Sequence, residues 1–105
     1  MTSGSDLAVV AGLAASLGLP EVVADGGVDQ LLPLIEHLRR QGLVVLLKWD
    51  GGRNDQVNGG TCTGLVSGLA EEGFFFRADL PSIEATAVAV LAKYGRWLAQ
   101  HPTAP

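Results

Sequence analysis

The spacing of the apolar residues changes at Gly42, and this change limits the folds open to the chain. Before Gly42 the apolar residues recur every three or four positions, which is the period of an amphipathic helix. From Leu43 to Asp50 they alternate, which is the period of a β-strand. A chain of 105 residues that contains both periods is expected to form a single α+β domain.

Two helices are expected before the change. The first covers residues 6–17, and Pro20 forbids its continuation. Residues 20–25 suggest one further helical turn, and the second helix begins near Asp29 and stops at Gly42. Residues 1–28 are therefore interpreted as a helical N-terminal segment.

Three strands and a long helix follow the change. The strands are expected at residues 43–50, 61–67 and 74–79, and the helix runs from Pro81-Ser82 to just before His101. The short link between the second and third strands favours antiparallel neighbours. The predicted order is α-α-β-β-β-α, with a three-stranded antiparallel sheet and the helices packed on one face. Residues 29–100 would form its α-β-β-β-α core, and residues 101–105 a frayed tail.

The first strand carries apolar residues on both of its faces. Trp49 shares one face with Val45 and Leu47, while Val44 and Leu46 make the other face apolar as well. This pattern is typical of a central strand covered at one end. Trp49 is expected to face the helices as a core anchor; in the outward alternative it would be an aromatic contact for a partner.

From residue 29 onward the order α-β-β-β-α resembles the topology of double-stranded-RNA-binding domains. Those domains carry a lysine-rich N-terminus on their last helix. Here residues 81–85 read Pro-Ser-Ile-Glu-Ala, and no cation precedes Lys93 in that helix. The resemblance is one of topology, and the charge predicts no nucleic-acid partner.

Acidic residues dominate the first third of the chain, and the net charge is −4. Residues 1–36 contain no Lys or Arg, and they include the acidic residues Asp6, Glu21, Asp25, Asp29 and Glu36. An acidic surface of this kind favours a basic protein partner. A solvated surface that only keeps the protein soluble is the alternative.

The side chains that usually carry catalysis or metal ions are few and scattered. His37, His101 and Cys62 do not have the spacing of metal ligands, and Cys62 is expected to be an inert, half-buried residue. Ser67 does not lie in a nucleophile-elbow motif, and the adjacent Glu71 and Glu72 diverge in an exposed turn. The sequence therefore predicts no enzyme, no metal and no cofactor.

The segment between Trp49 and Thr61 is rich in glycine. Its spacing fits neither a calcium loop nor a phosphate-binding loop, so residues 51–60 are interpreted as a long hairpin connection. Long loops often take part in binding. In that alternative, Arg53, Asn54 and Asp55 contact a partner at the tip of the loop.

A cytoplasmic location is expected because no apolar segment has the features of a membrane span or a signal peptide. None reaches the ~18 residues of a membrane span. Residues 7–19 have the length of a signal-peptide core, but no Lys or Arg precedes them. Neither a membrane partner nor export is therefore predicted.

These features together predict a small acidic protein-binding domain without catalytic activity, such as an inhibitor or an immunity or antitoxin-type protein that neutralises a basic partner. The expected contact residues are Trp49, Asp50, Arg53, Asn54, Asp55, Glu21, Asp25 and Asp29. The alternative is a homo-oligomeric accessory subunit, such as a homodimer, that buries the open sheet face around Phe75, with Trp97 as a second contact. A small-ligand-binding protein or an undetected enzyme is the third interpretation.

Overall fold

A computed structural model describes residues 4–50, 62–68 and 74–101. Its elements are α1 (Gly4–Ser16), the 3-10 helix η1 (Val28–Leu31), α2 (Leu32–Arg40), β1 (Val44–Trp49), β2 (Cys62–Ser67), β3 (Phe75–Leu80) and α3 (Ile83–Gln100). The predicted α+β fold, with three antiparallel strands between the second and the last helix, is confirmed.

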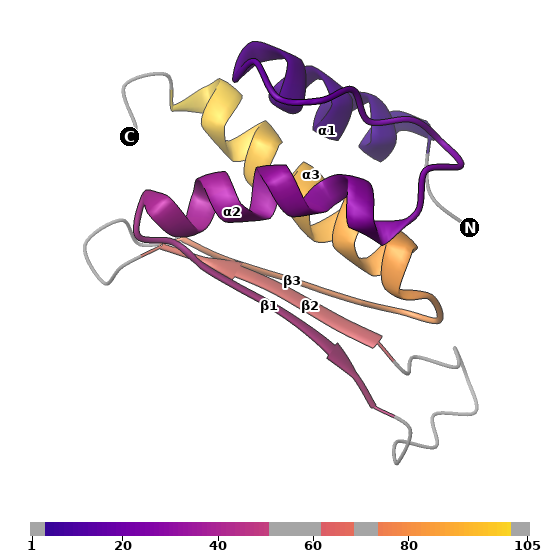
Figure 1. Ribbon diagram of the computed structural model, residues 1–105. Helices are drawn as coiled ribbons and strands as arrows, with labels where there is room; N and C mark the ends of the chain where they lie inside the picture. The colour runs from indigo at the N-terminus through magenta and orange to yellow at the C-terminus, as the bar shows by residue number, and fades with distance from the viewer. Residues whose placement is uncertain (1–3, 51–61, 69–73, 102–105) are drawn as a thin grey trace.

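The helices cover one face of the sheet (Figure 1). Helix α3 packs across β2 and β3, and α2 lies beside β1. Helix α1 packs against α3 and lies farther from the sheet than the other two helices. The other face of the sheet carries no helix of the described residues.

The strand order β1-β2-β3 makes β2 the central strand and β1 an edge strand. The prediction that residues 43–50 form a central strand is therefore wrong. The apolar residues on both faces of β1 led to that interpretation, because a continuous apolar run is typical of a strand covered on both sides. In the structure the helices cover only one of these faces.

The helix ends follow the local sequence. The hydroxyl oxygen of Ser82 caps α3 by accepting a hydrogen bond from the amide of Ala85, at 3.2 Å. Pro33 lies in the first turn of α2, where a missing amide hydrogen costs little. The helix suggested at residues 20–25 does not form: only Ala24 and Asp25 make a turn, closed by a hydrogen bond from the Gly26 amide to the Val23 carbonyl at 3.3 Å. The Gln30 side chain bonds both the amide and the carbonyl of Val23.

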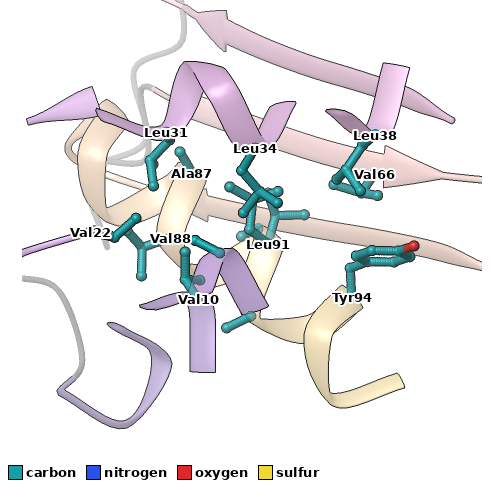
Figure 2. Packing of buried hydrophobic residues seen from close by; sticks show 14 of the residues in the cluster. Val10, Val22, Leu31, Leu34, Leu38, Val66, Ala87, Val88, Leu91 and Tyr94 are labelled. Carbon is teal, nitrogen blue, oxygen red and sulfur yellow. The ribbon is translucent and has the colours of Figure 1, made fainter. Parts of the chain in front are cut away.

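The core lies between the sheet and the three helices, with α3 at its centre (Figure 2). Helix α3 contributes a buried stripe that the helical spacing predicted, including Leu91 and Tyr94. Leu34 and Leu38 of α2 face this stripe. Because one helix contacts nearly every other element, α3 fixes which face of the sheet is covered.

An aromatic cluster closes the C-terminal end of α3. The ring of Trp97 lies 4.6 Å from Phe74 and 6.3 Å from Tyr94, measured between ring centroids. His101 ends the helix, stacks on Trp97 at 4.4 Å, and places its Nδ1 2.8 Å from the Trp97 carbonyl oxygen. The rest of the predicted frayed tail, residues 102–105, lies outside the described residues.

Candidate interaction face on the open side of the sheet

The strand register decides which side chains point away from the helices. Val45, Leu47, Val66, Phe76 and Ala78 share the helix-covered face and join the core. The alternate residues point to the other side. We call this side the open face; it consists of Val44, Leu46, Lys48, Thr63, Leu65, Ser67, Phe75, Arg77 and Asp79.

Large apolar side chains of the open face are exposed to solvent. Phe75 is 61% exposed, Val44 50% and Leu46 47%. Val44 and Phe75 flank Ser67 in one row across the sheet, and Leu46 lies next to Leu65 in the following row. Contiguous exposed apolar residues framed by charges are typical of a protein-interaction site.

Charged residues occupy the other end of the open face. Asp79 accepts a hydrogen bond from the Thr63 hydroxyl at 2.6 Å and one from Arg77 Nε at 2.9 Å. Arg77 donates a second hydrogen bond to Asp79 from its terminal guanidinium nitrogen, at 3.2 Å. The two bonds and the negative charge of Asp79 raise the pKa of the Arg77 guanidinium. Across the sheet, Lys48 Nζ lies 3.4 Å from the Asp50 carboxylate. A positive group thus stands at the β1 edge, and an acidic group bridged to Arg77 stands at the β3 edge.

Trp49 is not the core anchor that the strand pattern favoured. It lies on the same face as Val45 and Leu47, yet it is 65% exposed. Figure 1 shows the reason: the C-terminal end of β1 extends beyond the helices, so no helix of the described residues covers this end of the strand. The register therefore does not turn Trp49 to the open face as the outward alternative required; the residue is exposed on the helix side, and its contact with a partner stays a prediction.

The other predicted contact residues do not form one surface with Trp49. Glu21, Asp25 and Asp29 are exposed, and they lie between α1 and α2 in the helical layer. Asp50 is half-buried beside Lys48. Arg53, Asn54 and Asp55 lie outside the described residues.

The two residues proposed for self-association lie on opposite sides of the sheet. Phe75 points to the open face. Trp97 belongs to α3 and packs half-buried against Phe74 on the covered side. Only Phe75 is therefore placed where a second sheet can reach it.

The described residues considered for chemistry do not form a site, and Glu71 and Glu72 lie outside the described residues. Among the described residues no group of three His, Cys, Asp or Glu side chains is placed to hold a metal ion. Cys62 is buried rather than half-buried, and its Sγ lies 3.9 Å from the Pro81 carbonyl oxygen. A groove of about 510 Å³ runs beside β3, but Lys93 already bonds the Arg77 carbonyl oxygen there.

A smaller cavity of about 250 Å³ lies between α1, α2 and α3. Leucines line most of it, and the polar residues are His37, Gln41 and Tyr94. The His37 Nε2 atom is buried and has no hydrogen-bond partner within the described part of the chain. The sequence placed His37 at the surface or boundary of its helix, and the half-buried residue agrees with a boundary position. Helical spacing did not show that its Nε2 atom is enclosed next to α1.

Sequence reasoning missed most of the open face. It singled out Phe75 but left Val44, Leu46, Lys48 and Asp79 outside every candidate site. The available signal was the apolar pair Val44 and Leu46 on the second face of β1. Those residues indicate an uncovered surface only once β1 is known to be an edge strand.

Comparison with known proteins gives no assignment: no protein-family model matches the chain, and neither a curated protein nor a solved structure matches it. No helix within the described ranges is both long enough and apolar enough to cross a bilayer.

Proposed function

We propose that this protein acts without catalysis, by binding another protein through the open face of its sheet. The exposed apolar side chains of Val44, Leu46 and Phe75 carry the proposal. Water contact with these side chains is unfavourable by about 25 cal/mol per Å² of apolar surface, so a partner that covers them gains binding energy. Lys48 and Asp79 at the edges would fix the orientation of the partner, because charge complementarity supplies specificity.

The experiment compares two variants that each remove one exposed apolar side chain. Phe75→Thr keeps a residue suited to a strand and takes the aromatic ring off the open face. Leu32→Gln is the matched control, because Leu32 is also exposed but lies at the start of α2. Tagged protein is used to capture binding proteins from lysate of the cells that make it.

We expect the wild type and Leu32→Gln to retain a binding protein that Phe75→Thr does not retain. Identical captured proteins for all three forms would reject the open face as the binding surface. Circular dichroism of both variants shows whether the fold is kept.

The second candidate is the acidic inhibitor or immunity-type protein that neutralises a basic partner. Its supporting observation is the exposure of Glu21, Asp25 and Asp29 on one connection, in a part of the chain without Lys or Arg. A Glu21→Gln, Asp25→Asn, Asp29→Asn variant should then lose a partner that elutes at high salt. If this variant captures the same partner and releases it at the same salt concentration as the wild type, the acidic-inhibitor function is contradicted.

A further inference from the structure

The open face has a charge pattern that is complementary to itself. The register divides it into three rows across the sheet: Val44, Ser67 and Phe75; Leu46, Leu65 and Arg77; and Lys48, Thr63 and Asp79. Apolar residues fill most of the first two rows. In the third row a cation on β1 and an anion on β3 stand at opposite edges, two strands or ~10 Å apart.

Two copies of this face can stack in a symmetric sandwich in two ways, because the two-fold axis runs either along β2 or across the strands. An axis across the strands, through the middle row, would place Arg77 against the second copy's Arg77. It would also bring Lys48 and Asp79 onto apolar rows. Both contacts are unfavourable, because like charges repel and a charged side chain placed against apolar groups loses hydration without gaining an opposite charge.

An axis along β2 places β1 of each copy over β3 of the other. Lys48 then faces Asp79 of the second copy, and Val44 faces its Phe75. In the middle row the aliphatic stem of Arg77 lies over Leu46 of the second copy, while the guanidinium keeps its bonds to Asp79. Each contact occurs twice, as in any two-fold interface. We propose that the open face binds a second copy of this chain in this arrangement, which rests on the proposed function and names the partner.

The size of the face sets the expected strength of the dimer. Three strands of six residues span about 10–15 Å by about 20 Å. This area is well below the roughly 800 Å² per partner of a standard interface. The dimer should therefore be weak and concentration-dependent. Lys48 must exchange its 3.4 Å contact with the half-buried Asp50 for the shared one; the cost is small because the Lys48 side chain is exposed and such pairs contribute little.

The arrangement is tested with two charge reversals, Lys48→Glu and Asp79→Lys. In either variant alone, both cross-face pairs become like-charged, so the dimer dissociation constant should rise at least about tenfold. In a mixture of the two variants, each heterodimer contains two opposite pairs. The introduced glutamate of one copy faces the introduced lysine of the other, and the native Asp79 faces the native Lys48. Sedimentation equilibrium should therefore show dimer in the mixture and monomer in each variant alone.

A control variant separates the effect of total charge on dimerisation from the effect of the position of the charge. Arg40→Glu makes the same change in total charge as Lys48→Glu, but Arg40 lies on α2, away from the open face. Arg40→Glu should keep the wild-type dimer constant and should not reproduce the rescue when it is mixed with Asp79→Lys. If Asp79→Lys does not fold, Asp79→Asn replaces it; its mixture with Lys48→Glu should dimerise more tightly than Lys48→Glu alone.

Two outcomes overturn the inference: a wild type that stays monomeric at several hundred micromolar, or a mixture that dimerises no better than its components. The proposed function fails separately, when Phe75→Thr captures the same proteins as the wild type. A monomeric wild type with a Phe75-dependent partner of another sequence would keep the function and reject the second copy.

Discussion

Lys93 of α3 donates a hydrogen bond from its Nζ to the backbone carbonyl oxygen of Arg77 in β3, at 2.8 Å. The Gly68 amide donates a hydrogen bond to the Phe74 carbonyl oxygen at 3.3 Å, so the backbone groups of Phe74 point toward β2. In an antiparallel pair the backbone groups of successive residues point alternately toward and away from the neighbouring strand. By that alternation the Arg77 carbonyl points away from β2, to the free edge of the sheet. The last helix therefore caps one edge of the sheet, as lysines often do at exposed strands.

Lys93→Met should weaken the protein, because it keeps most of the aliphatic stem but removes the donor to the Arg77 carbonyl. We expect a loss of about 0.5–1 kcal/mol in the free energy of unfolding. Urea unfolding measures it, and Lys93→Arg, which keeps a donor, should lie closer to the wild type. Equal stability of Lys93→Met and the wild type would show that the bond contributes nothing.

Two helical glycines make a matched pair of tests for the contact between α1 and α3. A Cβ at Gly12 would meet nothing within 4 Å, whereas a Cβ at Gly95 would lie 2.9 Å from the Val9 side chain. Gly12→Ala should stabilise by about 0.5–1 kcal/mol through helix propensity alone. Gly95→Ala should be less stable than Gly12→Ala by about 1–3 kcal/mol, because the methyl group overpacks the helix crossing.

Urea unfolding of both glycine variants gives this difference directly. Helix propensity is common to the two substitutions and cancels in the comparison. Equal free energies of unfolding for the two variants would mean that α1 does not pack closely on Gly95.

Glu36 should make stability depend on pH. Hydrogen bonds from Arg39, at 2.6 and 2.8 Å, and the positive charges of Arg39 and Arg40 lower its pKa from 4.5 to about 2. A carboxyl group whose pKa is lower in the folded state stabilises above its unfolded pKa. This contribution is lost as the pH falls from about 4.5 through about 2.

The melting temperatures of the wild type and Glu36→Gln should therefore differ at neutral pH and converge in this acidic range. The pairs are exposed, so the difference should be small and should shrink with added salt. A difference that stays constant down to pH ~2 would contradict the lowered pKa, since the contribution of the Glu36 carboxylate should be fading there.

His37→Leu should stabilise the protein. The buried Nε2 atom has no hydrogen-bond partner in the described residues, and an unsatisfied buried polar atom costs about 1–3 kcal/mol. We expect a gain of about 1 kcal/mol in urea unfolding. His37→Gln is the control, because it improves helix propensity but keeps a polar group. A loss of stability in His37→Leu would mean that Nε2 is satisfied in solution.

The prediction from sequence was most successful where the signal is local. Helical spacing located α1, α2 and α3, the alternation of residues located the three strands, and the short link between β2 and β3 predicted their antiparallel pairing. Ser82 and Pro33 marked helix starts for reasons that act within one turn. The fold class followed from the order of these elements.

The candidate site was only partly predictable. The alternation rule placed Phe75 on an open face, but it could not show that Trp49 lies past the end of the helices. Nor could it show that Val44 and Leu46 remain uncovered. These exposures depend on where α2 and α3 end above the sheet, which residues distant in sequence decide.

The sequence by itself determined the secondary structure, the order of its elements and the acidic first third, because hydrophobic period, capping residues and charge are properties of neighbouring residues. The tertiary structure alone decided that β2 is central, that one face of the sheet is open, and that Lys48 and Asp79 stand at its opposite edges. It also decided that the Nε2 atom of His37 is buried. The physical reason is that exposure and charge geometry are properties of pairs of elements, and they exist only once α3 has packed across the sheet.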